Sequence, residues 1–284
     1  MKSRLGIFAL ALLLLPIAAS FLADRALPLV SGRADNGLPV LLGGVAIAFF
    51  AAVLDKVMAL NQRTSLWLNQ RNFLLASAAA GAVLAMLLAY LNVYVEFWET
   101  PANAWLPLAV ISGLIGSVFM PAVLVTRLAL ATFLVKWLSR RIYLPAMALS
   151  KRVWLSGMLA LIGLIGGAIW PEKLVVLLWL SPLLLLVALQ LAWNESTIFS
   201  AMVQGDWSRP VLAAVAGMAV GGVGVIGYLL AGGQLVFTYD FWLLAVFGLT
   251  CLQLSDVVAE WWRGKQGVPS RQKKPFPIPV VVKK

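Results

Sequence analysis

The feature that most constrains this chain is a series of apolar runs, each about twenty residues long, separated by short polar connections. A run of that length spans the hydrocarbon core of a bilayer as an α-helix. Helices are the only open-chain structure that satisfies its own backbone in lipid. Only 12% of the 284 residues are charged, about half the ~25% usual in soluble domains. We therefore predict an all-α, polytopic transmembrane helix bundle.

Eight runs are long enough, or nearly so, to cross the membrane. We expect spans at 5–22, 39–54, 73–95, 104–126, 153–170, 174–193, 210–231 and 241–258. Asp55 and Asp256 shorten the second and eighth spans at one end. The first run follows a basic start and precedes small residues at 18–20, so it is also open to a signal-peptide interpretation, which would leave seven spans. We favour a signal anchor and a transmembrane domain over residues 1–262.

The distribution of charge predicts the orientation. With eight spans and a cytoplasmic N-terminus, 19 of the 22 Lys and Arg residues fall on the inner side, and only Arg25, Arg33 and Lys173 fall outside. This asymmetry follows the positive-inside rule and accounts for the net charge of +11 without a nucleic-acid partner. Both termini are then cytoplasmic, and we expect a multi-pass protein of the cell inner membrane. Residues 263–284 form a basic, proline-rich cytoplasmic tail.

The rare residues exclude several kinds of chemistry. The chain has one cysteine, Cys251, and no histidine. Histidine-ligated haem or zinc, a histidine general base and a Ser-His-Asp triad are therefore impossible within the chain. An iron–sulfur cluster needs several thiolates. No phosphate-binding loop or dinucleotide fingerprint occurs either, and we expect neither a metal nor another cofactor.

A basic, apolar stretch follows the fourth span. Residues 127–152 mix apolar side chains with Arg127, Lys136, Arg140 and Arg141. Basic side chains of an interfacial helix extend toward the headgroups while their stems stay in apolar surroundings. We predict an interfacial helix here, with these four residues binding anionic lipid headgroups. The alternative is a fourth span displaced inward, to about 118–138.

Small residues four apart give a helix a flat surface that another backbone can approach closely. We expect close helix packing at Gly113, Gly163, Gly167, Gly217 and Gly221. Two of these glycines open similar segments, GLIGSVFMP at 113–121 and GLIGGAIWP at 163–171. Such similarity is compatible with an inverted repeat of the transporter kind, but the match is short and we favour chance.

The polar loop between the sixth and seventh spans is the strongest candidate site. Glu195, Asp206 and Arg209 lie in or beside it, and Asp256 and Glu260 end the eighth span. One interpretation is local: Asp206 or Ser208 caps the seventh span. The other brings the five residues together near the basic stretch, where carboxylates and arginines hold Mg²⁺ and a phosphate headgroup. We favour the local interpretation.

Three functions remain open. The first, which we favour, is a non-catalytic subunit or scaffold that packs against other membrane proteins and anionic lipid. The second is a transporter or channel for a small or lipid-like solute, with a polar cavity lined by Ser112, Ser117, Ser156, Thr250 and Gln253. The third is a membrane-embedded transferase acting on lipid or polyisoprenoid phosphate, with the five candidate residues of the loop region as its site.

Overall fold

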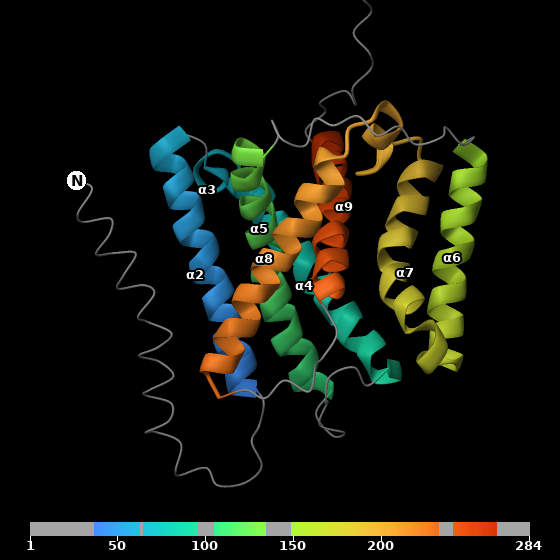
Figure 1. Ribbon diagram of the computed structural model, residues 1–284, viewed down its shortest axis with the longest axis horizontal. Helices are drawn as coiled ribbons and strands as arrows, with labels where there is room; N and C mark the ends of the chain where they lie inside the picture. Colours follow the sequence, from blue (N-terminus) through green and yellow to red (C-terminus); the bar gives the residue numbers. More distant parts are fainter. Residues whose placement is uncertain (1–36, 63–64, 96–104, 135–148, 233–240, 266–284) are drawn as a thin grey trace, which may run out of the picture.

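The computed structural model describes residues 37–62, 65–95, 105–134, 149–232 and 241–265 (Figure 1). Within these ranges the regular structure is helical and contains no strand, which confirms the all-α prediction. In chain order the helices are α2 (Gly37–Gln62), α3 (Leu66–Asn69), α4 (Arg71–Val95), α5 (Trp105–Leu134), α6 (Leu149–Ile169), α7 (Pro171–Ala192), the short 3-10 helix η1 (Ser200–Gln204), α8 (Ser208–Leu230) and α9 (Phe241–Lys265).

Seven of the described helices, all except α3 and η1, are long and apolar enough to cross a membrane. They coincide with the second to eighth predicted spans. The predicted first span at 5–22 and the tail residues 266–284 lie outside the described residues. Polytopic architecture is thus supported by seven helices.

Successive long helices run in opposite directions, so the chain returns repeatedly to one end of the bundle (Figure 1). We call this the loop end, because the connection between α7 and α8 lies there. It also carries the C-terminal ends of α2, α5 and α9. Among the described basic residues, only Lys173, at the start of α7, lies at the other end. The described basic residues therefore gather at one end of the bundle, as the sequence predicts.

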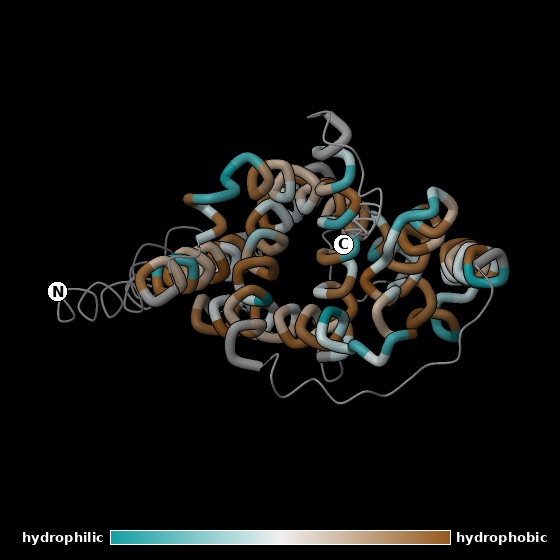
Figure 2. The backbone as a smooth tube through the Cα atoms, turned by 90° about the horizontal axis from the view of Figure 1, so that it is seen from above, coloured by the Kyte–Doolittle hydropathy of each residue, from teal (hydrophilic) through white to brown (hydrophobic). Residues whose placement is uncertain are grey.

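The helices form two groups. α2, α4, α5, α8 and α9 pack together, while α6 and α7 form a hairpin that joins them mainly through α7 on α9. Trp179 of α7 is almost fully buried and meets Phe247 of α9 edge-on, with 5.8 Å between ring centroids. In the view from above, the hairpin lies on one side of the bundle (Figure 2). One apolar cluster lies inside the five-helix group, and a second joins α7 and its loop to α5, α8 and α9.

Glycines lie at several helix contacts. Gly217 of α8 faces Gly248 of α9, and a Cβ built on Gly217 would lie 2.6 Å from the Cα of Gly248. Real Cβ atoms do not approach another backbone so closely, so this crossing requires glycine. The other four predicted packing glycines also face neighbouring helices: Gly113 faces Met86, Gly163 faces Leu177 and Ser181, Gly167 faces Leu178, and Gly221 faces Leu244.

Two helices continue past the acidic residues that were expected to end them. α2 runs through Asp55 to Gln62, and α9 runs through Asp256 to Lys265. The carboxylate of Asp55 accepts hydrogen bonds from Ser65 Oγ (2.6 Å) and from the backbone N–H of Leu66 (2.9 Å). An acidic group with such partners is compatible with a helix near the membrane boundary.

The stretch 127–152 is divided between two helices. Residues 127–134 continue α5, and residues 149–152 belong to α6. The intervening residues 135–148 lie outside the described residues, so the interfacial helix remains a prediction.

The similar segments at 113–121 and 163–171 differ in structural context, because Pro121 lies inside α5 whereas Pro171 begins α7. These contexts do not support an inverted repeat.

Candidate functional site

The α7–α8 loop begins with a well-defined helix end. Asn194 has a φ of 57°, in the left-handed region that asparagine tolerates better than most residues. Its N–H bonds to the carbonyl of Leu191 (3.1 Å), and the N–H of Glu195 bonds to that of Gln190 (2.8 Å). This pair of bonds is the Schellman motif. It turns the chain so that Glu195 faces α9 at the end of α7.

A buried glutamine pair attaches the loop to the bundle. Gln253 of α9 donates from Nε2 to Gln190 Oε1 of α7 and accepts the backbone N–H of Ile198 at 3.1 Å. Ile198 and both glutamines are fully buried. Buried amide groups are costly unless paired, so these bonds favour a single position for the loop across the ends of α7 and α9.

An ion pair joins α8 to α9 beside this loop. Arg209 Nη2 lies 2.9 Å from Asp256 Oδ1 and 2.8 Å from Asp256 Oδ2. The side chains of Arg209 and Asp256 are 32% and 21% exposed, so the pair remains accessible from the loop end. Arg209 lies in the first turn of α8, where the helix dipole disfavours a cation. The neighbouring carboxylate offsets this unfavourable placement.

Arg127 of α5 is a second guanidinium at the same place. It interacts electrostatically with both Arg209 and Asp256. Its Nε is buried and has no hydrogen-bond partner among the described residues. Two guanidiniums therefore lie within electrostatic range of one carboxylate, and Arg209 is the one that bonds to it. We call Arg127, Arg209 and Asp256 the arginine cluster.

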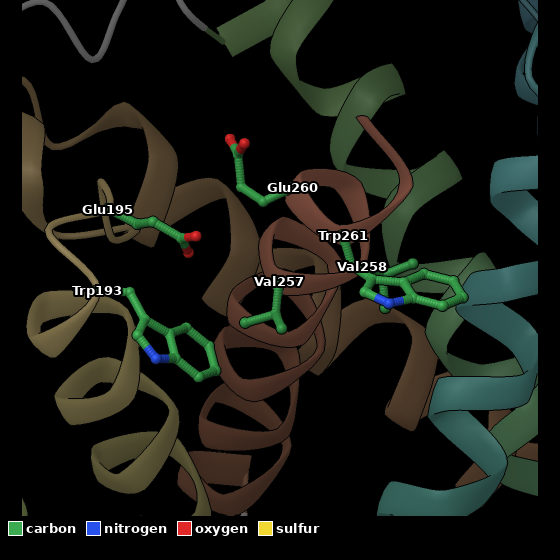
Figure 3. A pocket seen from close by; sticks show the side chains of 6 residues that line it. All are labelled: Trp193, Glu195, Val257, Val258, Glu260 and Trp261. Carbon is green, nitrogen blue, oxygen red and sulfur yellow. The ribbon is translucent and has the colours of Figure 1, made fainter. Parts of the chain in front are cut away.

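A pocket of about 340 Å³ lies next to the arginine cluster, between the end of α7 and α9 (Figure 3). It is lined by Trp193, Glu195, Val257, Val258, Glu260 and Trp261. The Glu195 carboxylate points toward α9, and the two indole rings lie on opposite sides of Val257 in this view (Figure 3). Both indoles are more than half exposed. We call this the acidic pocket.

The two carboxylates of the acidic pocket influence each other. Burial raises the pKa of Glu195 above its usual range, and the negative charge of Glu260 raises it further. Glu195 Oε2 is buried without a hydrogen-bond partner in the described part of the chain. Glu260 also interacts electrostatically with Asp256, one helical turn away. The acidic pocket and the arginine cluster are therefore adjacent.

Asp206 has a different role from the residues of the arginine cluster and the acidic pocket. Hydrogen bonds from the side chain and the backbone N–H of Ser208 lower the pKa of Asp206, and the backbone bond measures 2.9 Å. α8 begins at Ser208, with Trp207 at the N-cap position and Pro210 in the first turn. Asp206 thus satisfies a backbone donor at the start of α8, which agrees with the local interpretation, whereas Ser208 is the first helical residue and not the cap.

The structure links all five candidate loop-region residues: Glu195, Arg209, Asp256 and Glu260 through the ion pair and the interactions between carboxylates, and Asp206 through an electrostatic interaction with Arg209. It also includes Arg127 of the basic stretch, which was assigned to lipid binding and was expected near these residues in the second interpretation of the loop. Lys136, Arg140 and Arg141 lie outside the described residues. The role of Gln253 as a loop anchor was not foreseen, although a glutamine within an otherwise apolar span is a signal that it has a specific partner.

Three of the four hydroxyl groups expected around a transport cavity bond to their own helices. Ser117 Oγ donates to the carbonyl of Leu114 (2.6 Å), and Thr250 Oγ1 donates to that of Val246 (2.8 Å). Ser156 does the same with Arg152 at 2.7 Å. Such groups have less capacity to bind a passing solute, because their donors are already used.

Comparison with protein-family models, curated proteins and solved structures finds no match.

Proposed function

We propose that this chain is a non-catalytic integral membrane protein that binds the phosphate of a lipid headgroup at the arginine cluster and packs with other membrane proteins. The observation that carries the proposal is the ion pair of Arg209 with Asp256 at the loop end of the bundle, with a second guanidinium, that of Arg127, within electrostatic range of the same carboxylate. In this proposal the loop end faces the cytoplasm, as the positive-inside rule favours.

The number of hydrogen-bond donors supports an anionic ligand. Each guanidinium has five N–H donors, and one nitrogen of Arg209 makes both bonds to Asp256. The cluster carries a net charge of about +1, which a phosphodiester would neutralise. Phosphate accepts several charge-assisted hydrogen bonds from arginine. A phosphate also suits the position of Arg209, because the start of α8 favours an anion.

The experiment compares lipid retention in nanodiscs by native mass spectrometry. Arg209 is replaced together with its partner, as Arg209→Gln/Asp256→Asn, because removing one member would leave the other charge partly buried and unpaired. Arg127→Gln is tested separately. Lys151→Gln is the matched control, because Lys151 is a basic residue at the same end of the bundle and is exposed on α6.

We expect Arg127→Gln to retain phosphatidylglycerol about fivefold less than the wild type does. Arg209→Gln/Asp256→Asn leaves the net charge unchanged but removes the donors of Arg209, so its loss should be smaller, and the control should match the wild type. The estimate uses ~1 kcal/mol for each basic residue near an anionic headgroup. Equal retention by the wild type and both cluster variants would refute lipid binding at this cluster.

A transferase is the second candidate, and one observation favours it. The pKa of Glu195 is raised, and one of its oxygens is buried without a partner beside a predicted phosphate site. A carboxylate in that state suits a general base. Incubation with a polyisoprenoid phosphate as acceptor and a nucleoside-diphosphate compound as group donor, followed by ³¹P NMR of the product and the released nucleotide, tests this function. Turnover that is lost in a folded Glu195→Gln variant would support the transferase, and equal turnover by that variant would remove Glu195 from it.

A further inference from the structure

The acidic pocket has the chemistry of a site for an organic cation. Glu195 and Glu260 provide two negative charges, and Trp193 and Trp261 provide indole faces, on which cations bind well. Val257 and Val258 form an apolar surface between them. This combination of negative charge, aromatic rings and apolar surface accommodates an ammonium group attached to an amphiphilic molecule.

An ammonium that carries N–H groups fits better than a metal ion or a quaternary amine. The described residues contain no group of three or more His, Cys, Asp or Glu able to hold a metal. Ca²⁺ takes six to eight oxygen ligands, more than two carboxylates supply. Glu195 Oε2 is buried without a hydrogen-bond partner among the described residues. A primary ammonium would donate to that oxygen, whereas a quaternary amine has no proton to donate.

The arginine cluster lies one helical turn along α9 from this pocket. Asp256 and Glu260 are four residues apart, a rise of about 6 Å along the helix, and they interact electrostatically. The loop end therefore presents a region of positive charge beside a region of negative charge. A zwitterionic headgroup has the same arrangement, with a phosphodiester joined to an ammonium by two carbons.

We propose that the two sites together recognise a phosphoethanolamine headgroup, with the phosphate at Arg127 and Arg209 and the primary ammonium between Glu195 and Glu260. The inference rests on the proposed binding of phosphate at the arginine cluster. It adds a selectivity that phosphate binding alone does not provide. The same headgroup chemistry occurs in a membrane phospholipid and in soluble phosphoethanolamine, and the experiment separates these two sources.

The experiment uses three nanodisc lipids with the full-length protein. Phosphatidylethanolamine carries both groups, its N-acetyl derivative keeps the phosphate and lacks the ammonium, and phosphatidylglycerol supplies a phosphate alone. Retained lipid is counted by native mass spectrometry. The test variant is Glu195→Gln/Glu260→Gln. Glu172→Gln is the matched control, since Glu172 is exposed at the opposite end of α7.

We expect the wild type and the control to retain phosphatidylethanolamine about fivefold to tenfold better than its N-acetyl derivative, from one exposed cation–π contact and one partly buried charge pair. The double glutamine variant should lose this preference and still retain phosphatidylglycerol. Far-ultraviolet circular dichroism verifies that this variant is folded. Arg209→Gln/Asp256→Asn should weaken the retention of all three lipids.

The outcomes separate the two proposals. Suppose that the wild type shows no preference for phosphatidylethanolamine over its N-acetyl derivative, while the cluster variants retain less phosphatidylglycerol than the wild type. Then this inference fails and phosphate binding stands. If the cluster variants retain every lipid as well as the wild type does, phosphate binding fails and this inference fails with it. A further arm adds soluble phosphoethanolamine to phosphatidylglycerol nanodiscs. Binding there that is lost in the double glutamine variant would support recognition of the same headgroup from a soluble source.

Discussion

Replacing Gln253 by Leu tests how the α7–α8 loop is held. The substitution nearly preserves side-chain volume but leaves two buried groups without partners, Gln190 Oε1 and the N–H of Ile198. A buried polar group that loses its partner costs about 1–3 kcal/mol in soluble proteins, whereas hydrogen bonds between membrane helices contribute about 0.6 kcal/mol on average and about 1.7 at most. With two such bonds lost, we expect the unfolding free energy to fall by about 1–3 kcal/mol. Unfolding by sodium dodecyl sulfate from mixed micelles, followed by circular dichroism, measures this change.

A double-mutant cycle with Gln190→Leu isolates the bond between the two glutamines. The double variant leaves only the Ile198 N–H without a partner, and it should be more stable than the sum of the single losses predicts. Hydrogen bonds between membrane helices couple by about 0.6 kcal/mol on average and about 1.7 at most. Because both glutamines are fully buried, we expect the upper part of that range.

Two results would refute the reasoning about the loop anchor. Additivity of the two substitutions within about 0.3 kcal/mol would mean that the glutamines are not coupled. The second concerns the loop itself. Amide hydrogen exchange across residues 196–204 should accelerate in Gln253→Leu, and unchanged exchange there would mean that Gln253 does not hold the loop.

Two further predictions concern α8. Gly217→Ala should destabilise the protein by about 1–3 kcal/mol, because the added methyl group would overpack against Gly248. Gly222→Ala should be neutral or stabilising, because nothing lies within 4 Å of the added methyl group. Thermal unfolding in detergent compares the two variants, and equal stability would contradict the close approach of α8 and α9 at Gly217. Because Ser208 lowers the pKa of Asp206 in the folded state, its stabilisation should be present above the ordinary pKa of 3.8 and disappear as the pH falls through the lowered value. The difference in melting temperature between the wild type and Asp206→Ala should therefore shrink below about pH 4, and a constant difference would exclude this linkage.

The helices were predictable because the signal for a membrane span is local. Each apolar run contains enough information to specify a helix, and seven such helices occur in the structure. Their ends were less predictable. Asp55 was expected to end its helix, yet it receives hydrogen bonds from Ser65 and Leu66 across a turn. A single sequence shows the charge but not the partner that makes it tolerable.

The candidate site likewise combines features that the sequence predicts with contacts that it does not. The loop and the carboxylates were identified from their position at the ends of apolar runs. The pairing of Arg209 with Asp256 joins residues 47 apart, and the contribution of Arg127 comes from another helix altogether. Such contacts depend on which helices are neighbours, and amphipathic patterning is weak in helices that face lipid on several sides.

The two edges of the bundle share a short uncharged length. α2 and α6 lie at opposite edges (Figure 1), and their candidate spans contain 23 and 19 residues. The α2 span includes Asp55 and Lys56, and the α6 span begins with Lys151 and Arg152. The uncharged segments 38–54 and 153–169 contain 17 residues each, about 26 Å at 1.5 Å per residue. This is shorter than the ~30 Å hydrocarbon core, so the bilayer must thin at both edges or the charged side chains must extend to the headgroups. The protein is therefore expected to respond alike at its two edges when lipid chain length changes.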